Sequence, residues 1–260
     1  MSVRPGVAVL NAFGASGDLE AVPGGEVSTW RAGDLVFKRA PGADEWRWLG
    51  EHLPSVREEG FRLAKPVPAL DRRWVVEGWG AMAWLPGSPP TQARWGDIVA
   101  LSDRFHLAMR HLPKPSFVDR RTHPWAVGDR VAWDESGSPV RHAFLDRLLA
   151  LRRHVDLEPQ LIHGDLTGNV LFAEDGPPAV IDPTMYWRPA GYATAIVVGD
   201  AVRWEGADPH AMLETVAHLE AFPQLYVRAS IFRLVASLLF GGMDLEPYAL
   251  NVDLAERLTA

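Results

Sequence analysis

The sequence contains no cysteine, which excludes disulfide frameworks and thiolate metal sites. Its 26 Lys and Arg residues are outnumbered by 33 Asp and Glu residues, so the clustered basic face of a nucleic-acid-binding protein is not expected. No run approaches the ~18 apolar residues that a membrane helix requires, and the first ten residues lack the apolar core of a signal peptide. We therefore expect a cytoplasmic protein with neither nucleic acid nor membrane as a partner.

Two phosphate-binding glycine motifs are also missing, because the chain has neither a Walker-type loop nor a complete Gly-x-Gly-x-x-Gly. What is present is ordinary globular composition, with 47% hydrophobic and 23% charged residues over 260 positions. This length is comfortable for two lobes, each with its own core. No internal repeat or low-complexity stretch interrupts it.

Residues 1–80 are expected to form a small strand-rich lobe. Helical spacing appears once in this lobe, at Asp44–Leu53, where Trp46, Leu49 and Leu53 share one face. The candidate strands are short and bounded by turn residues: Val27–Trp30, Leu35–Phe37, Leu63–Val67 and Trp74–Gly78.

A Pro/Gly cluster at residues 81–90 predicts a linker, after which residues 91–260 are dominated by helical patterns. The helices expected in this larger lobe are Trp95–His111, Phe144–His154, Ala190–Trp204, Ala211–Leu219 and Leu225–Phe240. The chain is therefore predicted to be an α+β protein with a small sheet-and-helix lobe, a hinge and a larger, mainly helical lobe that carries the motif described next.

Residues 161–183 are the most informative stretch of the chain. Two apolar runs, Val170–Phe172 and Ala179–Ile181, flank a Gly/Pro/Asp turn and predict a hairpin. His163, Asp165, Asn169 and Asp182 stand at its ends. A phosphoryl-transfer site needs one carboxylate for the acceptor hydroxyl, and an Asn and a second Asp for Mg²⁺.

This stretch resembles the catalytic loop and metal-binding Asp of the aminoglycoside phosphotransferase-like (choline kinase-like) small-molecule kinases, whose fold is related to that of protein kinases. The order of lobes and motifs agrees with that family over most of residues 20–240. The resemblance implies a bilobal kinase-like fold, ATP or GTP as donor, Mg²⁺ as cofactor and a small-molecule hydroxyl as acceptor.

In this family the Asp two residues after the His orients the acceptor hydroxyl as catalytic base, which is the role implied for Asp165. His163 is expected to organise the loop, and a buried structural histidine is nearly the same interpretation. Asn169 and Asp182 are implied as Mg²⁺ ligands, since Mg²⁺ prefers hard oxygen donors and is completed by phosphates and water. The alternative for Asp182 is a turn Asp before Pro183.

The catalytic loop departs from the kinase pattern, which places four residues between the base and the Asn. Only Leu166, Thr167 and Gly168 lie between Asp165 and Asn169. Gly168 permits a tighter turn that delivers the Asn to the same point. Otherwise Asn169 is displaced, and Thr167 or water supplies the metal contact.

Lys38 resembles the lysine that pairs with the nucleotide phosphates, and a carboxylate normally steadies it. Glu45 is the preferred partner and Glu51 the second choice; a solvated strand-end lysine is the alternative. Gly24, Gly25 and Ser28 occupy the place of the nucleotide-covering loop, although an ordinary hairpin turn fits equally well.

Met82 and Trp84 lie in the segment that resembles the interlobe hinge and are candidates for the base pocket, with plain core as the alternative. Candidates for the acceptor site follow the metal Asp. Asp200 and Glu205 would hold amines or hydroxyls, and Trp187 or Trp204 would stack on a ring. The alternative is that these are solvated carboxylates and core aromatics.

The function predicted is a Mg²⁺-dependent phosphotransferase, monomeric or weakly dimeric, that moves the γ-phosphoryl group of ATP or GTP to a hydroxyl of an aminoglycoside, sugar, amino sugar or other metabolite. A catalytically weak nucleotide-binding or regulatory pseudokinase is the main alternative, because the catalytic and glycine loops are both reduced. A protein kinase is disfavoured, since the segment after Asp182 runs quickly into helix.

Overall fold

A computed structural model describes residues 4–22, 29–40, 42–90, 94–242 and 244–260. The chain forms two units, each with its own core. The first unit combines Met1–Ser88 with Leu171–Pro183, and the second combines Pro89–Val170 with Thr184–Ala260. No helix in the described ranges is long and apolar enough to cross a bilayer.

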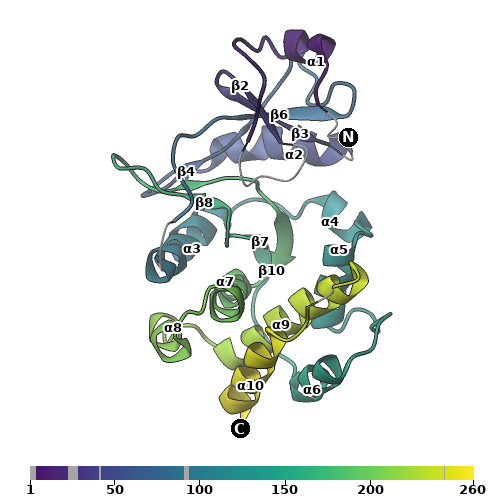
Figure 1. Ribbon diagram of the computed structural model, residues 1–260, viewed down its shortest axis with the longest axis vertical. Coiled ribbons are helices and arrows are strands. Elements are labelled where there is room, and N and C mark those ends of the chain that lie inside the picture. The colour runs from purple at the N-terminus through teal and green to yellow at the C-terminus, as the bar shows by residue number, and fades with distance from the viewer. Residues whose placement is uncertain (1–3, 23–28, 41, 91–93, 243) are drawn as a thin grey trace. The chain divides into compact units, whose positions relative to one another are not determined.

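The first unit is a sheet with helices (Figure 1). Its elements are α1 (Val7–Ala12), β1 (Glu20–Ala21), β2 (Trp30–Ala32), β3 (Leu35–Arg39), α2 (Ala43–His52), the 3-10 turn η1 (Leu53–Ser55), β4 (Arg62–Leu63), β5 (Pro66–Val67), β6 (Trp79–Ala83) and β9 (Ala179–Val180). Within the described residues the order of the main sheet is β1-β2-β3-β6-β5, and its neighbouring strands are antiparallel.

Successive side chains of β3 point to opposite faces of the sheet, and the two faces pack into two different hydrophobic clusters. Phe37 packs with Phe13, just beyond α1, in an edge-to-face pair with ring centroids 5.7 Å apart. Val36 packs instead with the cluster that contains Trp46 of α2. Because side chains two apart on a strand share a face, Lys38 lies on the same face as Val36, the face that carries α2.

The second unit is mainly helical. Its elements are α3 (Trp95–Met109), α4 (Ser116–Arg120), α5 (Pro124–Ala132), α6 (Ala143–Leu151), β7 (Gln160–His163), β10 (Met185–Arg188), α7 (Ala190–Trp204), α8 (Pro209–Thr215), α9 (Phe222–Leu239) and α10 (Tyr248–Thr259). α9 is buried along most of its length and packs against α5, α7, α10 and α6, as can be followed in Figure 1. Antiparallel pairing of β10 with β7 sets Met185 opposite His163.

The predicted α+β class with a small sheet-containing part and a larger helical part is confirmed. The predicted hairpin of residues 170–181 also forms: β8 (Val170–Leu171) is the neighbour of β9 in a sheet of order β4-β9-β8. Residues 171–183 belong to the first unit, however, and not to the larger lobe where we expected them. The cause is the parallel pairing of β9 with β4.

Two predicted strands were wrong in their bounds. The strand expected at Trp74–Gly78 is the approach to a turn, because Glu77 and Gly78 both have positive φ, and β6 begins only at Trp79. The strand expected at Leu63–Val67 is split, since β4 pairs with β9 whereas β5 pairs with β6. β6 also includes residues 81–83, which we had assigned to the linker.

Candidate active site

Asp165 lies in the loop that follows β7, and both of its carboxylate oxygens are hydrogen-bonded. Oδ1 accepts from Nη2 of Arg233 at 2.5 Å, and Oδ2 accepts from Nδ2 of Asn169 at 3.1 Å. The side chain remains 40% exposed. Each carboxylate oxygen has two acceptor positions, so Asp165 keeps the capacity to accept a further hydrogen bond.

The orientation of Asn169 follows from its partners. Its Nδ2 also donates to the backbone carbonyl of Asp165 at 2.6 Å. Both groups that face Nδ2 are pure acceptors, so the amide NH₂ must point toward Asp165, and Oδ1 is the atom left for another ligand. Gly168, with φ of 82°, closes the loop in the left-handed region that glycine adopts without strain. The shortened loop therefore still holds Asn169 against Asp165.

Two buried histidines brace the start of this loop. Nδ1 of His163 accepts from the backbone N–H of Asp165 at 3.0 Å, and the backbone N–H of His163 donates to Nε2 of His106 at 3.1 Å. Nδ1 of His106 lies 2.7 Å from the carbonyl of Ser102, a pure acceptor, which fixes the proton on Nδ1. Burial, with a smaller contribution from His163, lowers the pKa of His106 to about 3, so this ring is neutral.

Gly164 is required by a close approach. A Cβ at this position would lie 2.4 Å from Cδ2 of Tyr186, so only glycine lets that ring pack against the loop. The backbone N–H of Gly164 donates to the carbonyl of Thr184 at 2.8 Å. Burial and the nearby charge of Asp129 raise the pKa of Tyr186, which is therefore a neutral packing partner.

Lys38 and Asp182 form an ion pair in the first unit. Nζ of Lys38 lies 2.5 Å from Oδ2 of Asp182, and the two side chains are 23% and 39% exposed. Asp182 has φ of 50°, which is uncommon for a residue other than glycine. Such conformations cluster at functional sites, where surrounding structure must hold them.

The two residue types predicted as metal ligands are ones that suit Mg²⁺. The amide oxygen of Asn169 and the carboxylate of Asp182 are hard oxygen ligands, and the engagement of Nδ2 leaves the Asn169 oxygen available. Within the described ranges there is no group of three or more His, Asp and Glu side chains that forms an all-protein metal cage. A Mg²⁺ site of one or two protein oxygens completed by substrate phosphates does not need one.

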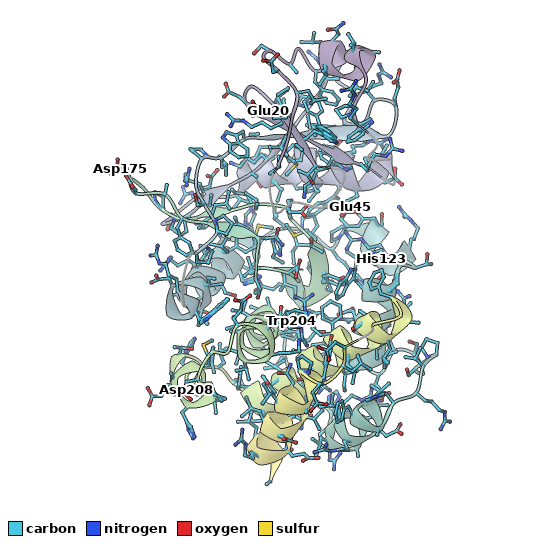
Figure 2. The ribbon with its side chains drawn as sticks, viewed as in Figure 1. Glu20, Glu45, His123, Asp175, Trp204 and Asp208 are labelled. Carbon is cyan, nitrogen blue, oxygen red and sulfur yellow. The ribbon has the colours of Figure 1, made fainter. Side chains whose placement is uncertain are left out.

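Other residues predicted for the nucleotide site have these positions. Met82 is buried in β6 in the core cluster with Trp46 and Ala64. Trp84 is half-buried, and the Arg31 guanidinium lies 4.2 Å from its ring centroid. Glu45, labelled in Figure 2, is in the first turn of α2. Its pairing with Lys38 stays a prediction. Gly24, Gly25 and Ser28 lie outside the described residues.

The candidates for the acceptor site differ in burial, because three of them are at least partly exposed and one is buried. Trp187 is half-buried in β10, while Trp204 and Glu205 lie exposed at the end of α7, where Trp204 is labelled in Figure 2. Asp200 is only 1% exposed, and its carboxylate binds Arg203 at 2.7 Å and Arg233 at 2.6 Å. The alternative of a solvated carboxylate at Asp200 was therefore wrong, because this carboxylate is buried and paired with two arginines.

Arg233 and His106 were not among the site residues predicted from the sequence. Arg233 stands in the apolar run of α9, and a charged residue inside such a run is costly to bury unless it is paired. That signal was available, but it does not name the partner. His106 follows Phe105 in the predicted amphipathic pattern of α3 and carries no comparable signal.

Comparison with known proteins identifies the family to which the chain belongs. Residues 23–225 match the model of the phosphotransferase enzyme family. The match covers most of the chain, so the protein belongs to this family and is a kinase of the small-molecule class.

Curated relatives include a probable ketoamine kinase of Thermus thermophilus, 28% identical over 259 residues, with 91% of this chain and 94% of the relative covered. A probable ketoamine kinase of Escherichia coli is 26% identical over 102 residues. This alignment covers 36% of this chain and 35% of the relative.

Solved structures share the fold at low sequence identity. A spectinomycin phosphotransferase in complex with ADP and spectinomycin has a TM-score of 0.61 and 14% identity, with 96% of each chain covered. An aminoglycoside phosphotransferase from Alicyclobacillus acidocaldarius has a TM-score of 0.61 and 18% identity, covering 97% of this chain and 93% of its own. Amicoumacin kinase, bound to AMP-PNP and Ca²⁺, has a TM-score of 0.62 and 14% identity, with 97% and 92% covered. These identify a kinase-like fold.

Proposed function

We propose that this kinase transfers the γ-phosphoryl group of ATP or GTP to a hydroxyl group of a small molecule in a Mg²⁺-dependent reaction. The acceptor oxygen forms a bond to the γ-phosphorus, the bond to the bridging β–γ oxygen breaks, and the hydroxyl proton passes to the carboxylate of Asp165. Because the transition state is loose, the main task of Asp165 is to position the hydroxyl.

The observation that carries this proposal is the contact between Asn169 and Asp165. The double hydrogen bond from Nδ2 ties the Asn to the base and turns its oxygen away. The shortened catalytic loop, with a displaced Asn, was one of the two arguments for a weak or inactive relative of the kinases. An Asn held beside the base supports an active enzyme.

Asn169 and Asp182 would hold Mg²⁺, and Lys38 would bind the nucleotide phosphates. When bound, Mg²⁺ supplies charge neutralisation on the phosphate oxygens. Lys38 and Asp182 already keep opposite charges next to each other in the first unit. The residue types therefore match an anionic nucleotide and its cation.

For the acceptor we propose a sugar-derived ketoamine as the first class to test. The Thermus relative, a probable ketoamine kinase, is similar over nearly the whole of both chains, which supports this choice. Trp187, Trp204 and Glu205 remain candidates for acceptor contacts. Asp200 is no longer proposed to contact the acceptor, because it is buried and paired.

Thermal stability with nucleotide tests the donor side of this proposal. ATP or GTP with Mg²⁺ should raise the melting temperature, because a ligand that binds only the folded state stabilises it. Asp182→Ala should remove the Mg²⁺-dependent part of the shift. Asp175→Ala, at the tip of the hairpin that is labelled in Figure 2, is the matched control and should retain it. Absence of any nucleotide-dependent shift in the wild-type protein would overturn the proposal.

A further inference from the structure

Arg233 is a buried arginine that bridges two carboxylates, which differ in their exposure to solvent. Its side chain is 5% exposed, as is expected deep within α9. Nη2 donates to Oδ1 of Asp165 at 2.5 Å and to Oδ2 of Asp200 at 2.6 Å, while Nε donates to Oδ1 of Asp200 at 3.1 Å. One carboxylate is buried and the other is 40% exposed in the catalytic loop.

The guanidinium is itself fixed from several sides. The two bonds to Asp200 form a fork that restricts both the position and the plane of the group. The ring centroid of Trp125 lies 5.2 Å from Cζ, within range of a cation–π contact. Tyr248 donates its hydroxyl to the backbone carbonyl of Arg233 at 2.9 Å. Arg233 therefore presents Nη2 to Asp165 from a rigid support.

The charges of Arg203, Asp200 and Asp165 indicate which carboxylate Arg233 neutralises. Arg203 donates to Asp200 at 2.7 Å, and both side chains are almost wholly buried, so these two already form a neutral pair. A second arginine is not required to neutralise Asp200. The carboxylate that Arg233 balances is Asp165, while Asp200 orients the arginine.

We propose that Arg233 is a positioning residue that holds the carboxylate of Asp165 in its reactive orientation, with Asp200 as the anchor of Arg233. This inference rests on the proposed function of Asp165. With Oδ1 held by Arg233 and Oδ2 by Asn169, the carboxylate has little rotational freedom, which is the preorganisation that phosphoryl transfer depends on.

The test is Arg233→Lys, which keeps the positive charge but replaces the planar fork by a single ammonium that cannot bridge both carboxylates. We expect kcat to fall by roughly 10- to 100-fold, the range that a misplacement of about 1 Å produces. The KM for nucleotide should change little. The matched control is Arg203→Lys, the same substitution against the same Asp200, but with no contact to Asp165. It should lower the melting temperature and leave kcat within about twofold, because Asp165 keeps its partner.

Combination with Asp165→Asn separates positioning from general structural support. If Arg233 acts through Asp165, then Arg233→Lys should reduce kcat much less in the Asp165→Asn background than in the wild-type background. An equal reduction in both backgrounds would overturn the inference, as would full activity of Arg233→Lys. A wild-type protein that binds no nucleotide and transfers no phosphoryl group would instead contradict the proposed function, so the two failures are distinguishable.

Discussion

The Nε2 atom of His106, in α3, accepts a hydrogen bond from the backbone N–H of His163 at the end of β7. His163 in turn accepts from the backbone N–H of Asp165. Two imidazoles thus connect a helix of the second unit to the loop that carries the proposed catalytic carboxylate. This bracing requires the unprotonated Nε2 of His106, so it depends on pH.

The first prediction concerns stability in acid. His106 has a pKa of about 3 in the folded protein against 6.5 for an unperturbed histidine. Between these values the unfolded state binds a proton that the folded state does not, so stability is highest above pH 6.5 and falls as the pH decreases. From pH 7 to pH 5 this residue should cost about 2 kcal/mol of the free energy of unfolding.

Urea unfolding of the wild-type protein and of His106→Gln at both pH values measures this contribution. The variant lacks the titrating ring and should lose about 2 kcal/mol less than the wild type over that interval. The same loss in both proteins would show that another group causes the acid sensitivity.

A second prediction compares two buried tyrosines. The hydroxyl of Tyr186 has no hydrogen-bond partner in the described part of the chain. The hydroxyl of Tyr248 donates to the backbone carbonyl of Arg233. Tyr186→Phe should therefore change the free energy of unfolding by less than about 0.5 kcal/mol or increase it, since it removes an unsatisfied polar group. Tyr248→Phe should reduce it by about 1 kcal/mol. A larger loss for Tyr186→Phe than for Tyr248→Phe would contradict this account.

A third prediction uses two glycines. Gly164→Ala would direct a methyl group into the ring of Tyr186 and should reduce the free energy of unfolding by about 1 to 3 kcal/mol. At Gly137 a Cβ meets nothing within 4 Å, so Gly137→Ala is the matched control and should stay within about 0.5 kcal/mol. Equal stability of the two variants would mean that the ring of Tyr186 moves away freely.

The parts of the fold that could be predicted from the sequence are those whose signal is local. Helix α7 was predicted with the bounds that it has, and α2 within one residue, because their apolar residues repeat with helical spacing. The turn at Glu77–Gly78 was missed because the apolar residues around it continue as if in one strand. The assignment of residues 171–183 to the first unit depends on the pairing of β9 with β4, more than a hundred positions away, which no local pattern reveals.

In the candidate site, too, local features were predicted from the sequence and long-range contacts were not. The motif residues His163, Asp165 and Asn169 lie close together in sequence, and the structure joins them by hydrogen bonds. Arg233 is 68 positions from Asp165, and its role depends on how α9 packs in the second unit. For the same reason the sequence did not predict that Asp200 is buried and paired with two arginines. Tertiary pairing of charges decides burial at such positions.

The most direct measurement is phosphoryl transfer by wild-type protein and by Asp165→Asn, with ATP or GTP, Mg²⁺ and a panel of ketoamines, sugars and aminoglycosides. The wild-type protein should phosphorylate at least one acceptor. Asp165→Asn should bind nucleotide as tightly but turn over roughly 10²- to 10⁴-fold more slowly, the usual contribution of a positioned base. Turnover by Asp165→Asn equal to that of the wild type would contradict the central claim that this carboxylate positions the acceptor.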